Sequence, residues 1–174
     1  MSWITHNRWY LVALAIVAPA AVLVALGAGW FSYVEAEDGR PIAVEPGDAI
    51  EYAGASWVLT DSGSIAAEDD GAENLGLLPG TSLVFVEVEV TPGSAAPDCT
   101  LQLIDAPGVR MWSPASYSDV DLEADEDAET YCSPDAEGKY TLQSWFVVPD
   151  DAVADSKLRL WSRDALPDHL VVSL

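Results

Sequence analysis

Residues 81–91 read TSLVFVEVEVT, and the fold class follows from this short segment. Valine occupies every second position from 84 to 90, and glutamate stands at two of the positions between. Successive side chains of a β-strand point to opposite faces, so this alternation predicts a strand with one apolar and one solvated face. Pro92 and Gly93 follow directly and end the strand.

Similar short runs recur on both sides of this strand, and no helical period appears among them. The further predicted strands span residues 49–52, 56–60, 100–104, 109–112, 139–148, 157–161 and 169–173. Seven to nine short strands separated by turn residues are typical of an antiparallel β-sandwich. We therefore expect an all-β domain over residues 48–174. Residues 35–47, with two glycines and two prolines, are expected to form a linker.

An uncharged segment over residues 9–34 precedes this domain. At about 1.5 Å per residue, a helix of this length crosses the roughly 30 Å hydrocarbon layer of a bilayer. Trp9 and Tyr10 stand at one end and Trp30 and Phe31 at the other, as expected for two interfacial aromatic belts. The segment therefore predicts one N-terminal transmembrane α-helix.

The charges on either side of this helix predict its orientation. Arg8 precedes it, whereas all 29 acidic residues lie at or beyond Glu35. Positively charged flanks of a membrane helix stay in the cytoplasm. We therefore expect residues 1–8 on the cytoplasmic side of a bacterial cell membrane and the bulk of the chain on its outer side. A cleaved signal peptide is the alternative, because Ala25-Leu26-Gly27 offers a small-x-small cleavage site. The length of the run and its flanking aromatics favour the anchor.

The chain has two cysteines, Cys99 and Cys132, and both lie in the predicted external domain. An even number of cysteines outside the cytosol favours a disulfide. Its alternatives are weaker, because two cysteines do not complete a zinc site and the spacing is not the CxxC of redox proteins. We therefore predict a Cys99–Cys132 disulfide that pins a loop to a strand.

Several segments together resemble a known family. They are Val84–Val90, Leu101–Asp105 with Gly108, Cys132, Gly138 and Trp145–Pro149. In this order they resemble a family of bacterial domains of unknown function that are secreted or membrane-anchored immunoglobulin-like sandwiches. These domains are akin to a small secreted immunoglobulin-like antigen of mycobacteria. The resemblance covers roughly residues 48–174 and implies an immunoglobulin-like antiparallel β-sandwich. The family carries no established catalytic residues to transfer.

The charge balance restricts the partners and suggests one possible ligand. With 7 basic and 29 acidic residues the formal net charge is −22, which repels nucleic acid. An extended backbone would place Asp119, Asp121, Glu123 and Asp125 on one face, and clustered carboxylates suit calcium. A solvated acidic loop is the favoured interpretation, because Ala124 stands where an EF-hand loop needs glycine.

Catalytic groups are sparse in the predicted external domain. His169 is its one imidazole, and the spacings of nucleophile-elbow, zinc-protease and phosphate-loop motifs are absent. Met111 and Trp112, where a strand opens into a loop, form a possible binding surface. We therefore expect a non-enzymatic binding module that contacts another membrane or cell-envelope protein. The alternative is a calcium- or solute-binding ectodomain that uses residues 119–129.

Overall fold

The computed structural model describes residues 14, 17–24, 26, 39–93, 98–116, 120, 128–133, 136 and 138–174. The chain divides into two compact units, Met1–Gly39 and Arg40–Leu174. Residues 14, 17–24 and 26 of the first unit are helical. Within the described residues, no helix has the length and apolar character needed to cross a bilayer. Trp9, Tyr10, Trp30 and Phe31, the predicted interfacial residues, lie outside the described residues.

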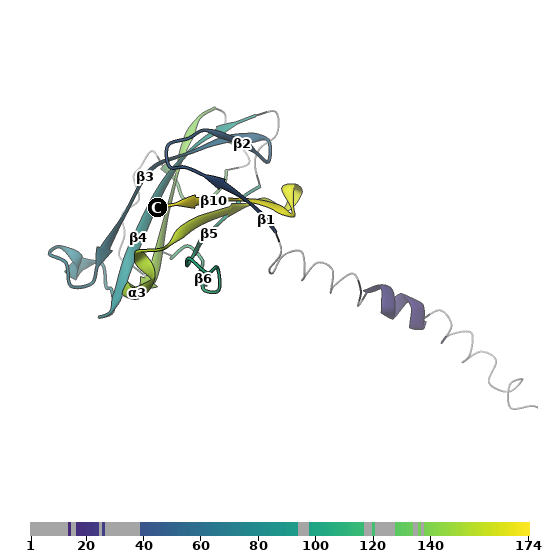
Figure 1. The fold of residues 1–174 in the computed structure, drawn as a ribbon, viewed down its shortest axis with the longest axis horizontal. Helices are drawn as coiled ribbons and strands as arrows, with labels where there is room; N and C mark the ends of the chain where they lie inside the picture. Colours follow the sequence, from purple (N-terminus) through teal and green to yellow (C-terminus); the bar gives the residue numbers. More distant parts are fainter. Residues whose placement is uncertain are drawn as a thin grey trace, which may run out of the picture. The chain divides into compact units, whose positions relative to one another are not determined.

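The second unit is a sandwich of two β-sheets, which confirms the prediction of an all-β domain (Figure 1). Sheet A has the order β1 (Arg40–Val44), β10 (Asp168–Ser173), β9 (Lys157–Trp161), β5 (Thr100–Ile104) and β6 (Met111–Trp112). Sheet B has the order β2 (Ile50–Tyr52), β3 (Ala55–Ala66), β4 (Thr81–Pro92), β8 (Tyr140–Pro149) and β7 (Ala128–Glu129). Three short helical turns complete the unit: η1 (Ala72–Asn74), α3 (Asp150–Val153) and η2 (Arg163–Ala165).

The valine-rich segment forms β4, at the centre of sheet B between β3 and β8. Its four alternating valines are at most 3% exposed, whereas Glu87 and Glu89 on the other face are half-buried. The valines pack against inward-facing residues of sheet A such as Leu103, Leu158 and Leu170 in a single hydrophobic core. The predicted alternation of apolar and polar residues therefore matches the alternation of buried and half-buried residues along β4.

Two edge strands depart from the predicted antiparallel arrangement. β1 pairs with β10 in parallel, and β7 pairs with β8 in parallel, whereas the other pairings are antiparallel. β1 also occupies residues 40–44, inside the expected linker. Most of its residues are exposed, so it has no alternating apolar pattern, and Pro41 is tolerated because the strand lies at a sheet edge.

β3 is longer than predicted and continues through the polar residues 61–64. Its register against β4 shifts between Leu59 and Asp61, which marks a bulge. Beyond the bulge, Gly63 pairs with Phe85, and a Cβ on Gly63 would lie 2.6 Å from the Phe85 ring. An aromatic ring thus covers a glycine across the strands, a pairing that stabilises a stretch with weak strand propensity.

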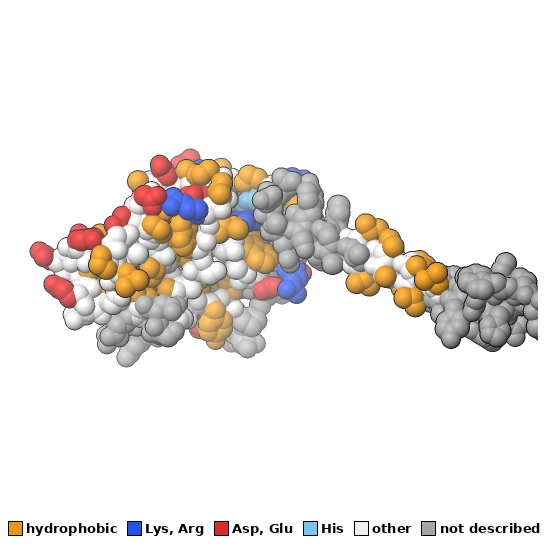
Figure 2. All heavy atoms as spheres, turned by 90° about the horizontal axis from the view of Figure 1, so that it is seen from below, with side chains coloured by type: hydrophobic (Ala, Val, Ile, Leu, Met, Phe, Trp, Pro, Cys, Tyr) orange, Lys and Arg blue, Asp and Glu red, His pale blue; other side chains and the backbone are white. Residues whose placement is uncertain are grey.

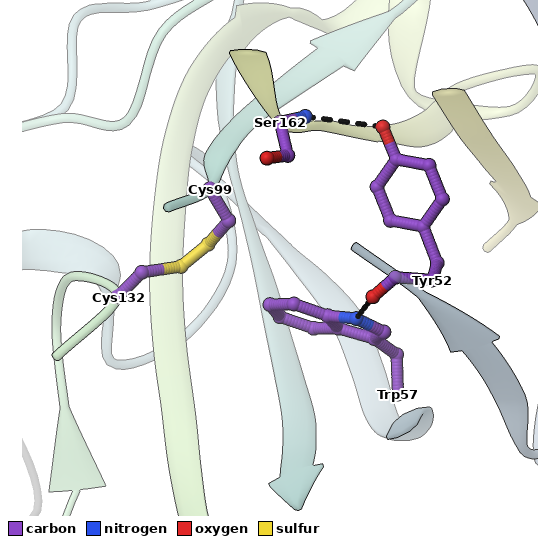
Figure 3. Close-up of a disulfide and its surroundings, with 5 residues drawn as sticks. All are labelled: Tyr52, Trp57, Cys99, Cys132 and Ser162. Atoms are coloured by element: carbon purple, nitrogen blue, oxygen red, sulfur yellow. Dashed lines mark hydrogen bonds between the residues drawn. A yellow bond between two sulfur atoms is a disulfide. The ribbon is translucent and has the colours of Figure 1, made fainter. Parts of the chain in front are cut away.

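One end of the sandwich is closed by covalent and polar contacts between the sheets (Figure 3). Cys99, just before β5, is bonded to Cys132, after β7, with a Cα–Cα distance of 5.7 Å. This confirms the predicted disulfide between a strand and a loop. Nearby, the Tyr52 hydroxyl donates to the Asp168 carbonyl at 2.7 Å and accepts from the Ser162 N–H at 3.1 Å. A residue of sheet B thereby holds two segments of sheet A.

Candidate functional site

The outer face of sheet A is the part of the described domain that differs most from the rest in charge. Its strands alternate between buried leucines or valines and outward-facing residues. The outward-facing residues are Pro41, Ala43, Thr100, Gln102, Ile104, Met111, Lys157, Arg159, Trp161, His169, Val171 and Ser173. None of them is acidic, although the chain has 29 acidic residues.

The outer face of sheet B has the opposite character. Its strands present Glu51, Asp61, Glu87 and Glu89. Lys139 forms an ion pair with Glu89, and the side-chain amide of Gln143 donates to Glu87 at 2.7 Å. Figure 2 shows many acidic side chains toward one end of the domain, with Lys, Arg and His side chains elsewhere on this face, some of them beside acidic ones. The outer faces of the two sheets therefore differ in charge.

Arg159 lies near the centre of the outer face of sheet A, in register with Gln102 of β5 and Val171 of β10. One of its terminal nitrogens contacts the sulfur of Met111 at 3.7 Å, and its buried Nε has no hydrogen-bond partner. Burial lowers the pKa of the Arg159 guanidinium. In the described part of the chain, carboxylates pair with Arg40, Arg110 and Lys139 but not with Arg159. Arg159 therefore retains unused donor capacity.

His169 is buried, with 7% of its surface exposed. It is in register with Pro41 of β1, a strand that the sequence pattern does not predict. Burial and the nearby charge of Arg159 lower the pKa of His169, so its neutral form predominates at pH 7. Among the described residues, its Nδ1 has no hydrogen-bond partner.

The two residues of the predicted binding surface point to different sides of sheet A. Met111 is 49% exposed and belongs to the outer face. Trp112 is in register with the fully buried Leu103 and packs against the core. The Arg110 guanidinium lies 5.5 Å from the centroid of the Trp112 ring, a cation–π contact. Trp112 therefore contributes to packing at the sheet edge, not to the outer face.

Arg110 is itself fixed by two carboxylates. Its Nε donates to Asp105 at 2.9 Å and its terminal nitrogen to Asp151 at 3.1 Å. Asp105 is buried and also accepts the backbone N–H groups of Val109 and Arg110, which closes the turn between β5 and β6. The Arg110 side chain lowers the pKa of Asp105. This cluster stabilises the turn that carries Met111.

Arg159 was not predicted from the sequence as a surface residue of interest. The available signal was the alternation in residues 157–161, KLRLW, in which two cations and a tryptophan share one face of a strand in an otherwise acidic chain. The four predicted calcium ligands, Asp119, Asp121, Glu123 and Asp125, lie outside the described residues. Within the described ranges, no three His, Cys, Asp or Glu residues gather to hold a metal ion.

Comparison with known proteins gives similarity to solved structures alone. No protein-family model matches the chain, and no curated protein sequence matches it. An uncharacterized β-sandwich protein from Clostridium difficile 630 is 12% identical, with a TM-score of 0.46 over 80% of this chain and 98% of that one. The yjhA protein from Bacillus subtilis is 11% identical, with a TM-score of 0.49 over 75% and 98%.

A third similar structure is a functionally unknown protein from Listeria monocytogenes EGD-e. It is 8% identical, with a TM-score of 0.44 over 73% of this chain and 80% of that one. At these identities the similarity concerns the fold alone.

Proposed function

We propose that this chain is a membrane-anchored, extracytoplasmic binding module of a bacterial envelope, without catalytic activity, and that the outer face of sheet A contacts its partner. One observation carries the proposal: this described face holds no carboxylate in a chain with 29 acidic residues, and its half-buried Arg159 has no carboxylate partner. A membrane or cell-envelope protein that presents carboxylate or carbonyl oxygens would satisfy this guanidinium.

The residue types of this face support a protein partner. Tryptophan, methionine and arginine are enriched in protein interfaces, and Trp161, Met111 and Arg159 lie on this one surface. Arg159 is already half-buried in the free protein, so part of its hydration and rotamer freedom is lost before any partner arrives. Less free energy is then spent on ordering this side chain when a partner binds.

The anchor is supported by residues 9–34, which carry no charge. The helical residues described in the first unit lie inside this segment, and their large apolar side chains are exposed. Those of Leu14, Val17, Leu23 and Val24 are between 62% and 72% exposed. Exposed apolar side chains on a helix favour insertion into lipid. Residues 1–8 would then lie in the cytoplasm and the sandwich outside.

The resemblance to immunoglobulin-like domains is part of the proposal. The segments that carry it fall on neighbouring strands: Val84–Val90 lies in β4 and Trp145–Pro149 in β8, which pair with each other. Leu101–Asp105 covers most of β5 in the opposite sheet. If relatives of this chain, once collected, failed to align these segments with that family, the proposed kinship would be wrong.

Site-specific photo-crosslinking in native membranes tests the contact surface. A photoreactive residue at Gln102, on the outer face of sheet A, should give an adduct of defined mass, whereas one at Thr141, on the outer face of sheet B, should not. In the Gln102 background, Arg159→Glu should reduce the adduct about tenfold or more, because a central arginine is often a hot spot. Arg163→Glu reverses an equal charge on an exposed residue outside this face and should leave the adduct unchanged. Equal adducts from both faces would contradict the proposal.

The anchor has its own test. The protein should remain in the membrane fraction after alkaline carbonate extraction, and mass spectrometry should recover residues 1–8 at its N-terminus. A mature N-terminus near Ala28 would show a cleaved signal peptide and contradict the anchor. The contact surface on sheet A would be unaffected by that result.

A further inference from the structure

A hydroxyl group interrupts the core-facing row of β8. Leu142, Ser144, Phe146 and Val148 point toward sheet A, and each is at most 2% exposed. The Oγ of Ser144 is buried and has no hydrogen-bond partner among the residues that the structure describes. Buried hydroxyls without partners are rare because they lose their hydrogen bonds to water and gain none in return. A serine at this position therefore calls for an explanation other than packing.

Ser144 borders two adjoining hollows at the edge of the sandwich. One has a volume of about 240 Å³ and is bounded in part by Trp145 and Pro114. The other, of about 170 Å³, is bounded in part by Tyr131 and the Cys99–Cys132 bridge. Pro114, Thr130 and Ser144 border both hollows. Together the two reach the lower end of the range of small-molecule pockets, about 300 to 1,000 Å³.

The described residues around these hollows are uncharged. None is Asp, Glu, Lys, Arg or His, although acidic residues dominate the chain. Among these described residues, a charged ligand would lose its hydration without gaining a counter-charge. The rings of Trp145 and Tyr131 and the ring of Pro114 supply apolar surface, and Ser144 and Thr130 supply hydroxyl groups. An apolar face beside hydroxyl groups is also the surface pattern of an uncharged sugar ring.

We propose that this pocket binds a small uncharged molecule with one apolar face and several hydroxyl groups, the chemistry of a neutral sugar, and that Ser144 hydrogen-bonds to it. The site lies at the edge of the sandwich beside β8, and among its described lining residues only Thr100 belongs to the outer face of sheet A. It does not rest on the proposed contact with an envelope protein.

Two serine variants separate binding from stability. Ser144→Val removes the unpartnered hydroxyl and places methyl groups in the hollow, so the fold should be at least as stable as that of the wild type. Ser82, buried in β4, donates from its Oγ to Asp150 at 2.6 Å. Ser82→Ala should therefore lower the melting temperature and leave the pocket intact. Ser144→Val should weaken sugar binding about tenfold or more, because the site loses its hydrogen-bonding group.

The experiment uses the full-length protein in a detergent without a sugar head group. Glucose, galactose and N-acetylglucosamine are added to about 10 mM, and the indole N–H signal of Trp145 is followed by NMR. A saturable shift with at least one neutral sugar, retained in Ser82→Ala and weakened in Ser144→Val, is the expected result. Glucuronate and glucosamine, which are charged, should not shift the signal.

Three outcomes would overturn the proposal. The first is that no neutral sugar shifts the Trp145 signal. The second is that the charged sugars bind as well as the neutral ones. The third is that Ser144→Val binds like the wild type or melts at a lower temperature, which would give Ser144 a purely structural role.

Discussion

Replacement of Tyr52 by phenylalanine should destabilise the sandwich, because one hydroxyl connects the two sheets there. The Tyr52 hydroxyl donates to the Asp168 carbonyl at 2.7 Å and accepts from the N–H of Ser162, a residue that is 2% exposed. A hydrogen bond contributes about 0.5–1.5 kcal/mol, and a buried group left without its partner adds about 1–3 kcal/mol. The phenylalanine ring keeps the packing, so the loss comes from the hydrogen bonds alone. The free energy of unfolding should therefore fall by about 2–4 kcal/mol.

Urea denaturation followed by tryptophan fluorescence measures this loss, because Trp57 donates its Nε1 proton to the Tyr52 carbonyl at 2.8 Å. Tyr140→Phe is the matched control. The Tyr140 hydroxyl is also buried and lies near the Ser133 backbone, but it makes no hydrogen bond of good geometry. Its removal should change the free energy of unfolding by less than about 0.5 kcal/mol. Equal losses in the two variants would refute the reasoning.

The same hydroxyl predicts an alkaline transition. Burial raises the pKa of Tyr52 above its ordinary value of 10.0. The folded state therefore favours the protonated phenol, and this contribution to stability is present below pH 10 and lost as the pH rises through the folded pKa. The wild type should lose stability above pH 10 more steeply than Tyr52→Phe, which a series of denaturation curves would measure.

Three further predictions concern the bridge, the β5–β6 turn and the buried histidine. Replacing both Cys99 and Cys132 by serine should lower the free energy of unfolding by about 3–4 kcal/mol, since the bridge closes a loop over a separation of 33 residues; an unchanged urea midpoint would argue against a stabilising bridge. Asp105→Asn should lower the melting temperature at neutral pH. The Arg110 side chain holds the pKa of Asp105 below 3.8, so the stability that the ionised carboxylate contributes is lost as the pH falls through its folded pKa. The melting temperatures of the variant and the wild type should then converge. The pKa of His169 lies below its ordinary 6.5 because of burial, so wild-type stability should decrease as the pH falls below 6.5; His169→Gln should flatten that dependence in melting curves, and an identical slope would contradict it.

Local patterns were enough to predict the central strands. Thr100–Ile104 and Lys157–Trp161 have the bounds expected from their alternation, because each strand places every second side chain in the core. The polar half of β3 was missed, because its stability comes from pairing with β4 and from the Phe85 ring over Gly63. Cross-strand partners override the low strand propensity of such residues.

The candidate binding face depends on contacts that no local pattern contains. Gln102, Arg159 and Val171 are neighbours only because β5, β9 and β10 lie side by side in sheet A. The sequence analysis predicted each strand but not the order of the strands within a sheet. A face free of carboxylates becomes visible only once that order is known. Trp112 was placed on the predicted surface for the same reason, since its partner Leu103 was not known to face the core.

The parallel strand β1 determines where a recombinant fragment of the β-sandwich should begin. A fragment starting at residue 48, the boundary that the sequence suggests, would lack β1 and leave the backbone donors and acceptors along one side of β10 without partners. Val44 would also be missing from its place against the core. Bare strand edges recruit other chains, so such a fragment should self-associate, whereas one that begins at Gly39 keeps the edge paired.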